Sequence, residues 1–347
     1  MPQINRIMAF KAGNDQLKRR CGTIKQACDK QEYVFAQTRE PLSEGYSPGL
    51  WVRSYIFVYR KQHIKSYNMA KLIADSGSTK CQWCLVDKGR KKHIYTHGIS
   101  PYFLNKLQVT ELIQKEVAPK LKKHNIKEIY YYGTGCKRAA NRQMIKSAIG
   151  KVFPGAAISV NHDLMAAARA LCGDQQGIVC ILGTGSNSCY YNGNKILKNS
   201  PGIGYILGDE GSGAYLGKKV LQYFLYKTFD EELRFLFQKK FNTDDTEILE
   251  NIYKRPLPNR YLASHAIFLA ENRGHYMIEN IIEDGLNDFF FQHICKYRES
   301  WKLPIHFVGG VAYGFRDVVK ELCKTYELEL GSISKTPMDG LIVYHTT

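Results

Sequence analysis

Apolar residues from position 69 onward fall into two kinds of segment that alternate along the chain. Some are short apolar runs bounded by turn residues, and others have apolar residues every three or four positions. Strands are predicted at 71–75, 81–87, 92–97, 128–132, 157–160, 177–182, 188–191 and 305–308, and helices at 104–124, 139–149, 164–171, 211–227, 276–296 and 313–325. Strands that alternate with helices in this way predict an α/β protein.

One arrangement occurs twice in the chain. A strand, a turn rich in Gly, Ser and Thr, and a second strand are predicted around Gly77 and again around Gly185, about 108 residues later. The repeat predicts two related α/β domains that face one another. We place the first domain at 69–175 and the second, with helical insertions, at 176–335, and expect the last segment, 336–347, to return to the first domain.

Residues 1–68 differ from the rest of the chain, because they show little sustained periodicity and contain many turn formers between Glu40 and Gly49. The apolar segment Leu50–Tyr59 predicts a lone strand or helix. Met69 then stands directly before a strong strand. We interpret 1–68 as a basic extension that is poorly ordered or not native, with the folded protein starting at Met69. A functional basic arm is the alternative.

A chain that begins at Met69 tests this interpretation. We expect it to unfold cooperatively at the same temperature as the full chain and to keep its activity, because the predicted core lies wholly beyond Met69. Circular dichroism during heating, together with an activity assay, measures both. Loss of folding or of activity would show that the extension is part of the functional protein.

Composition narrows the class of protein. The apolar fraction of 44% and the charged fraction of 23% are those of a soluble globular protein, and 347 residues suffice for two domains. No stretch approaches the roughly 20 apolar residues that span a membrane. The N-terminus also lacks the apolar segment of a secretory signal.

The net charge of +17 favours anionic ligands such as nucleotides. Residues 1–68 contribute +7 of it, from 12 Lys or Arg against 5 Asp or Glu, and the other residues contribute +10. The basic residues are scattered over helix faces, as at Lys115, Lys120, Lys122 and Lys123, without a nucleic-acid-binding motif. We therefore expect small-molecule partners and no dedicated nucleic-acid or membrane partner.

The ten cysteines are dispersed. Cys81 and Cys84 alone have a metal-like spacing, and no second pair completes a zinc site. Residues three apart in a strand point to opposite faces, so these two thiols are poorly placed to act together. Free thiols in a reducing cytoplasm are the interpretation.

Two glycine-rich turns suggest a phosphate site. In Asp75–Lys80, the aspartate at the strand end is suited to Mg²⁺, and Gly77 allows a tight turn whose N–H groups face phosphate oxygens. Gly183–Ser188 combines two glycines with three hydroxyl residues after a buried strand. Each is alone explicable as an ordinary hairpin turn. Together they predict a clamp around the phosphates of a nucleotide.

Three further segments have functional and structural interpretations. Asp163, at a strand end that opens a helix, is either a helix cap or the acceptor of a proton from a sugar hydroxyl during phosphoryl transfer. Asp209, within the glycine-rich Gly202–Gly213, either complements a helix dipole or binds sugar hydroxyls. Gly309 and Gly310 follow a strand, where adenosine could lie flat against the backbone or the chain simply turns.

In this order, the five segments resemble the actin-like ATPase superfamily of sugar kinases, and within it the BadF/BadG-type ATPases that include N-acetylglucosamine kinase. The most specific elements are Gly183–Asn187 and Gly208–Ser212, separated by 20 residues. The resemblance covers the chain from Met69 onward. It implies two RNase H-like domains that close over a cleft, ATP-dependent phosphorylation of an amino sugar at its 6-hydroxyl, ATP and Mg²⁺ as cofactors, and a homodimer in the cytoplasm.

The resemblance also implies roles for individual residues. Asp163 would be the general base, and Asp75 would serve the Mg²⁺ site. The nucleotide-binding residues would be Gly77, Ser78, Thr79, Lys80, Gly183, Thr184, Gly185, Gly309 and Gly310. The substrate-binding residues would be Ser100, Ser186, Asn187, Gly202, Ile203, Gly204 and Asp209.

One departure and two alternatives bear on these roles. The kinase pattern has a sugar-binding Asn after the third strand, where this chain has Gly98–Phe103, and Ser100 or Tyr102 is the expected substitute. The first alternative is an iron–sulfur ATPase activator of a 2-hydroxyacyl-CoA dehydratase, which needs cysteines after the second phosphate motif. Cys180 and Cys189 flank that motif instead. The second alternative is a non-catalytic sugar-binding regulator, disfavoured by the presence of Asp75 and Asp163.

Overall fold

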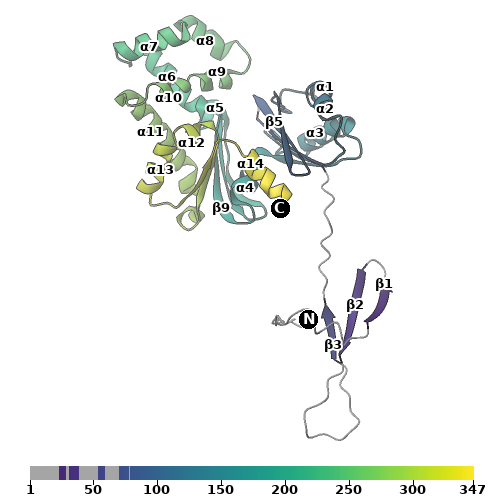
Figure 1. Ribbon diagram of the computed structural model, residues 1–347. Helices are drawn as coiled ribbons and strands as arrows, with labels where there is room; N and C mark the ends of the chain where they lie inside the picture. Colours follow the sequence, from purple (N-terminus) through teal and green to yellow (C-terminus); the bar gives the residue numbers. More distant parts are fainter. Residues whose placement is uncertain (1–22, 29–30, 39–53, 59–69, 78) are drawn as a thin grey trace, which may run out of the picture. The chain divides into compact units, whose positions relative to one another are not determined.

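The computed structural model describes residues 23–28, 31–38, 54–58, 70–77 and 79–347 (Figure 1). The chain divides into two compact units, Met1–Tyr67 and Asn68–Thr347. In the first, β1 (Thr23–Cys28), β2 (Gln31–Thr38) and β3 (Ser54–Val58) form an antiparallel sheet in the order β1-β2-β3. The strand β3 lies within the apolar segment expected to be a lone strand or helix, whereas β1 and β2 were not predicted from the sequence.

The second unit begins with a five-stranded mixed sheet. Its strands are β4 (Ala70–Ser76), β5 (Lys80–Asp87), β6 (Arg90–His97), β7 (Ile126–Gly133) and β8 (Ala157–His162), in the order β6-β5-β4-β7-β8. The first three strands pair antiparallel, and β7 and β8 are added in parallel. Helices α1 (Lys106–Glu116), α2 (Ala118–Leu121) and α3 (Ala139–Val152) accompany this sheet. Leu72 and Ala74 of β4 join the hydrophobic core beneath α1 and α3.

The predicted single helix at 104–124 is wrong, because α1 ends at Glu116 and α2 begins at Ala118. Pro119 lies in the first turn of α2. Proline has no N–H to donate and its ring clashes with the carbonyl four residues earlier, so it kinks or breaks a helix whose interior it occupies. The boundary therefore falls just before the proline.

A second five-stranded sheet repeats the strand order of the first. Its strands are β9 (Gln176–Leu182), β10 (Ser186–Asn192), β11 (Ile196–Ser200), β12 (Ile305–Val308) and β13 (Leu330–Ser334), in the order β11-β10-β9-β12-β13. In both sheets three antiparallel strands come first, and two parallel strands are added beside the first of them. This match confirms the α/β class and the predicted internal repeat.

Most of the remaining helices accompany the second sheet. They are α5 (Gly204–Leu207), α6 (Gly213–Leu225), α7 (Glu231–Phe241), α8 (Asp245–Tyr253), α9 (Pro258–Ser264), α10 (Ile267–Glu271), α11 (Tyr276–Gln292), η2 (Ile294–Lys296), η3 (Arg298–Trp301), α12 (Gly310–Gly314) and α13 (Arg316–Thr325). Ile178, Cys180 and Leu182 of β9 point into the core that α6, α11 and α13 share. Within the described residues, no helix is both long and apolar enough to cross a membrane.

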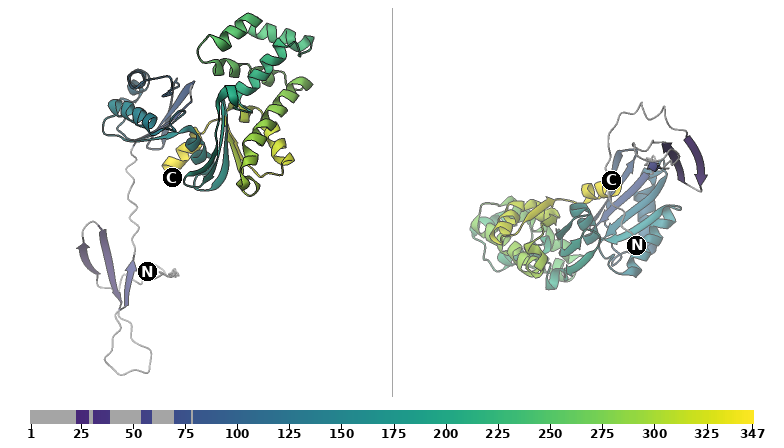
Figure 2. Two further views of the ribbon diagram at one scale, coloured as in Figure 1. Left: turned by 180° about the vertical axis from the view of Figure 1, so that it is seen from behind. Right: turned by 90° about the horizontal axis from the view of Figure 1, so that it is seen from below.

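Two helices lie between the sheets (Figures 1 and 2). Helix α4 (Asp163–Cys172) packs Ala166 against the first sheet, and Ala167 and Ala168 against the second. Helix α14 (Met338–Thr346) packs Met338, Leu341 and Ile342 against the first sheet and Ala166 of α4. The C-terminal segment thus lies on the sheet that contains β4.

Polar contacts fix the end of α14. Lys71 Nζ donates to the backbone oxygen of His345 at 2.7 Å, and Tyr132 Oη lies 2.8 Å from His345 Nε2. Arg169 Nη1 of α4 donates to the same tyrosine oxygen at 2.8 Å. Burial, with the nearby positive charges of Arg169 and Lys71, lowers the pKa of His345 to about 4. A neutral imidazole is therefore the form that packs here at neutral pH.

The positions of Cys81 and Cys84 agree with their interpretation as free thiols on opposite faces of a strand. Cys81 belongs to the core on one face of the first sheet and Cys84 to the cluster on the other, so the two thiols point apart. Both are buried and free. A shared metal or a disulfide between them is excluded by this arrangement.

Gly340 allows the close approach of α14 to α4, since a Cβ there would overlap the backbone oxygen of Ala170. We expect Gly340→Ala to lower the free energy of unfolding by about 2 kcal/mol or more, because backbone atoms must move to make room. Gly314→Ala is the matched control, as no atom lies within 4 Å of its Cβ position. Chemical denaturation measures both variants. Equal stability of the two would contradict the close-packing account.

Candidate active site

Two carboxylates lie at the carboxyl-terminal end of the first sheet. Asp75 is the second-last residue of β4, and Asp163 is the first residue of α4, directly after β8. Burial, followed by the negative charge of Asp163, raises the pKa of Asp75 to about 7 against the opposing effect of Lys80. The two carboxylates are therefore close enough to interact, and a shared cation would relieve their repulsion.

The turn after β4 is held by a residue that the sequence analysis did not single out. Ser76 is fully buried, and its hydroxyl accepts a hydrogen bond from Ile99 N at 2.9 Å. This contact ties the predicted phosphate turn to the loop after β6. Gly77 N donates to Lys80 O at 3.0 Å and closes the turn, where Thr79 and Lys80 are exposed. The predicted Ser78 lies outside the described residues.

The second glycine-rich turn, 183–185, is bound to the start of α6. Gly213 N donates to Gly183 O at 2.8 Å, and Ala214 N donates to Thr184 O at 3.0 Å. Gly309 has a φ of 129°, and a Cβ there would overlap the backbone oxygen of Leu182. The structure thus brings Gly309 beside the turn at Gly183.

Gly310 begins α12, and nothing lies within 4 Å of its Cβ position. Open space beside Gly309 and the 183–185 turn is suited to a flat ligand group. Gly309 and Gly310 thus lie close to the 183–185 turn, as their predicted shared role in nucleotide binding requires.

Asp209 faces the same turn from the loop before α6. A Cβ on Gly185 would lie 2.8 Å from Asp209 Oδ2, and a Cβ on Gly202 would lie 3.1 Å from Asp209 Oδ1. Backbone N–H groups of Ser186 and Gly204 stabilise the carboxylate, although burial raises its pKa overall. Asp209 also has a φ of 57°, an uncommon conformation for a residue with a side chain. The glycines are needed here to admit the carboxylate.

Ser186 and Asn187 lie beside this carboxylate. Asn187 Oδ1 accepts hydrogen bonds from Ser188 N and Asn199 Nδ2, both at 2.9 Å. Within the described residues, its amide NH₂ group is the part available to a ligand. Ser186 Oγ is buried and has no hydrogen-bond partner within the described part of the chain. A bound ligand could form the hydrogen bond that this buried hydroxyl lacks.

The remaining predicted substrate residues are less closely grouped. Ile203 is 55% exposed, and Gly204 has a φ of 85° at the start of α5. Ser100 is 2% exposed and its hydroxyl accepts from Tyr102 N at 3.4 Å, whereas the Tyr102 side chain is largely exposed. A ligand therefore meets Tyr102 more readily than Ser100.

Helix α4 connects the carboxylates at the end of the first sheet with the residues beside the second sheet. Leu164, which follows Asp163, packs with Val308 and with the partly buried Ile181 near the ends of β12 and β9. Asp163 thus lies where the carboxyl-terminal ends of strands from both sheets meet, the usual place for a ligand in α/β proteins. Lys137 Nζ donates to Asn199 Oδ1 at 3.0 Å and so links the loop after β7 to β11.

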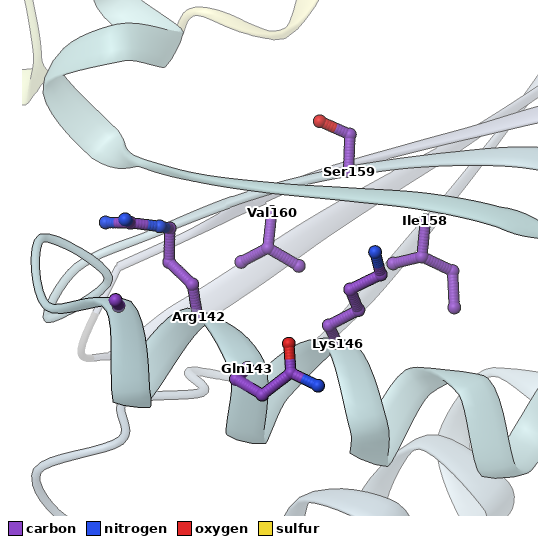
Figure 3. A pocket seen from close by; sticks show the side chains of 7 residues that line it. Arg142, Gln143, Lys146, Ile158, Ser159 and Val160 are labelled. Carbon is purple, nitrogen blue, oxygen red and sulfur yellow. The ribbon is translucent and has the colours of Figure 1, made fainter.

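A hollow of about 430 Å³ lies elsewhere, between α3 and the edge strand β8. Figure 3 shows Arg142, Gln143 and Lys146 on the helix side of it, with β8 on the other side. The sequence analysis predicted no role for these residues. A second hollow of about 490 Å³ is lined by residues of 171–176 and 303–306.

Glu210 and His293 are further polar residues beside the site that sequence reasoning missed. Their side chains meet at 3.4 Å between His293 Nε2 and Glu210 Oε2. Glu210 could have been noted because it follows Asp209 directly. His293 gives no local signal, since it stands far along the chain after α11.

The arrangement defines a two-lobed, actin-like ATPase with duplicated RNase H-like lobes. Residues 74–230 match the BadF/BadG/BcrA/BcrD ATPase family. The structure resembles a protein of Porphyromonas gingivalis solved as a candidate N-acetylglucosamine kinase, with 38% identity, a TM-score of 0.76, and coverage of 79% of this chain and 98% of that one. It also resembles a candidate N-acetylglucosamine kinase of Chromobacterium violaceum, with 17% identity, a TM-score of 0.60, and coverage of 80% and 98%.

No curated protein sequence matches the chain. The 38% identity over nearly the whole of the P. gingivalis protein, together with the family match, settles the family. The chain belongs to the BadF/BadG/BcrA/BcrD ATPase family.

The raised pKa of Asp75 predicts a pH-dependent cost to stability. Below its ordinary value of 3.8, Asp75 is protonated in both the folded and unfolded states. As the pH rises toward 7, Asp75 ionises freely in the unfolded state, whereas the folded state keeps it protonated. The free energy of unfolding therefore falls. Asp75→Asn does not titrate. Relative to wild type, we expect it to gain stability between pH 4 and pH 8, by at most about 4 kcal/mol.

Denaturation of both proteins across this pH range, without Mg²⁺, measures the difference. Asp174→Asn, which changes an exposed carboxylate, serves as the control. Parallel pH profiles for wild type and Asp75→Asn would show that Asp75 ionises normally and is not held in a buried site.

Proposed function

We propose that this protein transfers the γ-phosphoryl group of ATP to the 6-hydroxyl of an amino sugar, N-acetylglucosamine or a close relative, in the cytoplasm. The observation that carries the proposal is the position of Asp163. It begins the helix shared by the two lobes, interacts with Asp75 on one side, and lies near the strand ends of the second sheet on the other. The similarity to the P. gingivalis protein supports the substrate class.

Asp163 is the proposed general base. Leu164 N donates to its Oδ1 at 2.8 Å, which fixes the carboxylate at the start of α4. From there it can accept the proton of a sugar hydroxyl as that oxygen attacks the phosphorus. Phosphoryl transfer demands chiefly positioning and charge stabilisation, which a rigid helix terminus provides.

The chemistry of the carboxylates fits Mg²⁺. Mg²⁺ typically binds one or two carboxylates and keeps several waters and phosphate oxygens as its other ligands. Asp75, buried at the strand end, is the proposed protein ligand. Among the described residues, no group of three or more His, Cys, Asp or Glu side chains could hold a metal. When bound with ATP, the cation would neutralise phosphate charge.

Nucleotide and sugar would occupy adjoining parts of the second lobe. Backbone N–H groups of the 183–185 turn would hold phosphates, and adenosine would lie against Gly309 and Gly310. The sugar would contact the unpartnered Ser186 hydroxyl, the Asn187 amide group and the Asp209 carboxylate. Buried polar groups of this kind discriminate strongly between sugars, because a missing hydroxyl leaves them unpaired.

Cysteine burial weighs against the iron–sulfur activator. Cys180 and Cys189 are fully buried in two different hydrophobic clusters, on opposite faces of the second sheet. Neither thiol reaches the surface, where a cluster shared by two subunits would need it. The interacting pair of carboxylates weighs against the non-catalytic regulator. Their mutual repulsion does not stabilise the fold, and a bound cation would relieve it.

Asp163→Asn tests the proposal. We expect kcat to fall by roughly 100-fold or more, because proton acceptance is lost, while ATP affinity and thermal stability stay close to wild type. An ATP-coupled assay against a panel of amino sugars measures turnover, and calorimetry measures ATP binding. Near-normal phosphorylation by this variant would refute the role of Asp163.

A 6-deoxy analogue of the accepted sugar provides the matched control. It should inhibit competitively without being phosphorylated. Turnover of the analogue would show that another hydroxyl is the acceptor.

A further inference from the structure

The loop that bears Asp209 adopts a conformation that needs external support. Asp209 and Gly211 both have positive φ, at 57° and 67°. A Cβ on Gly211 would lie 2.8 Å from Phe289 Cβ, so this loop sits directly on the end of α11. A non-glycine residue in the left-handed region stores strain that the surrounding structure must overcome.

His293 supplies a contact to this loop from the end of α11. It is 2% exposed, and its ring stacks on Phe289 with centroids 4.6 Å apart. Its Nε2 lies 3.4 Å from Glu210 Oε2, and its Nδ1 lies 3.2 Å from Ser188 Oγ. One buried ring thus joins the residue after Asp209 to the residue after Asn187.

The contacts continue beyond Ser188. Ser188 Oγ lies 2.9 Å from Tyr297 Oη, which accepts a hydrogen bond from Ser200 N at 2.6 Å. Ser188 Oγ is also 3.5 Å from Ser200 O, a longer contact. Ser188, Tyr297 and His293 are all buried, so water does not compete for these bonds.

One arrangement of protons satisfies the series of hydrogen bonds from Ser200 to Glu210. Ser200 N–H donates to Tyr297, whose hydroxyl donates to Ser188, whose hydroxyl in turn donates to His293 Nδ1. The proton on Nε2 then faces the Glu210 carboxylate. This order needs a neutral imidazole, and burial lowers the pKa of His293 although Glu210 opposes the shift.

We propose that His293 is a positioning residue that sets the two sides of the sugar pocket relative to each other. Through Ser188 it holds the strand that bears Asn187, and through Glu210 it holds the loop that bears Asp209. The inference rests on the proposed sugar-kinase function. His293 touches neither substrate nor nucleotide in this assignment, so its effect appears in sugar binding.

The test uses the full chain with His293→Leu, His293→Gln and Tyr297→Phe. We expect the sugar KM to rise about tenfold or more in His293→Leu and severalfold in Tyr297→Phe, with the ATP KM unchanged. His293→Gln should recover part of the loss, because glutamine can still donate to Glu210. His306→Leu is the control, since His306 contacts Ser332 on β13 and takes no part in this series of hydrogen bonds.

Hydrogen exchange of residues 202–211 provides a second readout, expected to quicken at least severalfold in His293→Leu and Tyr297→Phe. A sugar KM within twofold of wild type and unchanged exchange in both variants would overturn the inference. An equal rise in the sugar and ATP KM values would also overturn it, because that indicates a general structural role. If the wild type phosphorylates no sugar, the proposed function fails, and exchange still decides whether His293 holds the loop.

Discussion

Helix α4 packs against both sheets at once, and the position of Asp163, the proposed general base, depends on this packing. Its central residues are alanines, Ala166 toward the first sheet and Ala167 and Ala168 toward the second. Small side chains let both sheets approach the helix closely. Gly340 does the same for α14, whose backbone approaches that of Ala170. The first residue of α4, Asp163, is therefore placed at the junction by core packing rather than by a flexible loop.

The site carries unfavourable features that the rest of the fold must offset. Asp75 is held beside a second carboxylate where burial disfavours its charge, Asp209 has a left-handed backbone, and Ser186 Oγ is buried without a partner within the described chain. Each costs stability in the free protein. Each is also a feature that a cation, a nucleotide or a sugar would relieve, which is the usual association between strain and function.

The sequence allowed most strands and the internal repeat to be predicted, because apolar runs beside glycine-rich turns are local signals. The edge strands β11 and β13 were missed, since Ile196–Ser200 and Leu330–Ser334 are short and partly polar. The helix at 104–124 was drawn through Pro119, whose effect on the backbone outweighs the apolar spacing around it. The strands β1 and β2 were missed because their segment shows no sustained alternation.

The candidate site likewise contains some residues that local sequence could identify and others that only the fold reveals. Asp75, Asp163, Gly183, Asp209 and Gly309 stand in short motifs, so local sequence was enough to single them out, and their roles stay predictions. Ser76 was overlooked inside its own motif, because its hydrogen bond to Ile99 depends on tertiary structure. His293 could not be found, since only the fold brings the end of α11 to Glu210 and Ser188.

The central claim is that the junction at Asp163 directs phosphoryl transfer to a sugar hydroxyl. Phosphorus NMR of the product formed from ATP, Mg²⁺ and N-acetylglucosamine tests it most directly. The account predicts a single sugar phosphate, esterified at the 6-position, formed in step with ADP. Release of ADP and inorganic phosphate without a sugar phosphate, for this and every related amino sugar, would contradict it.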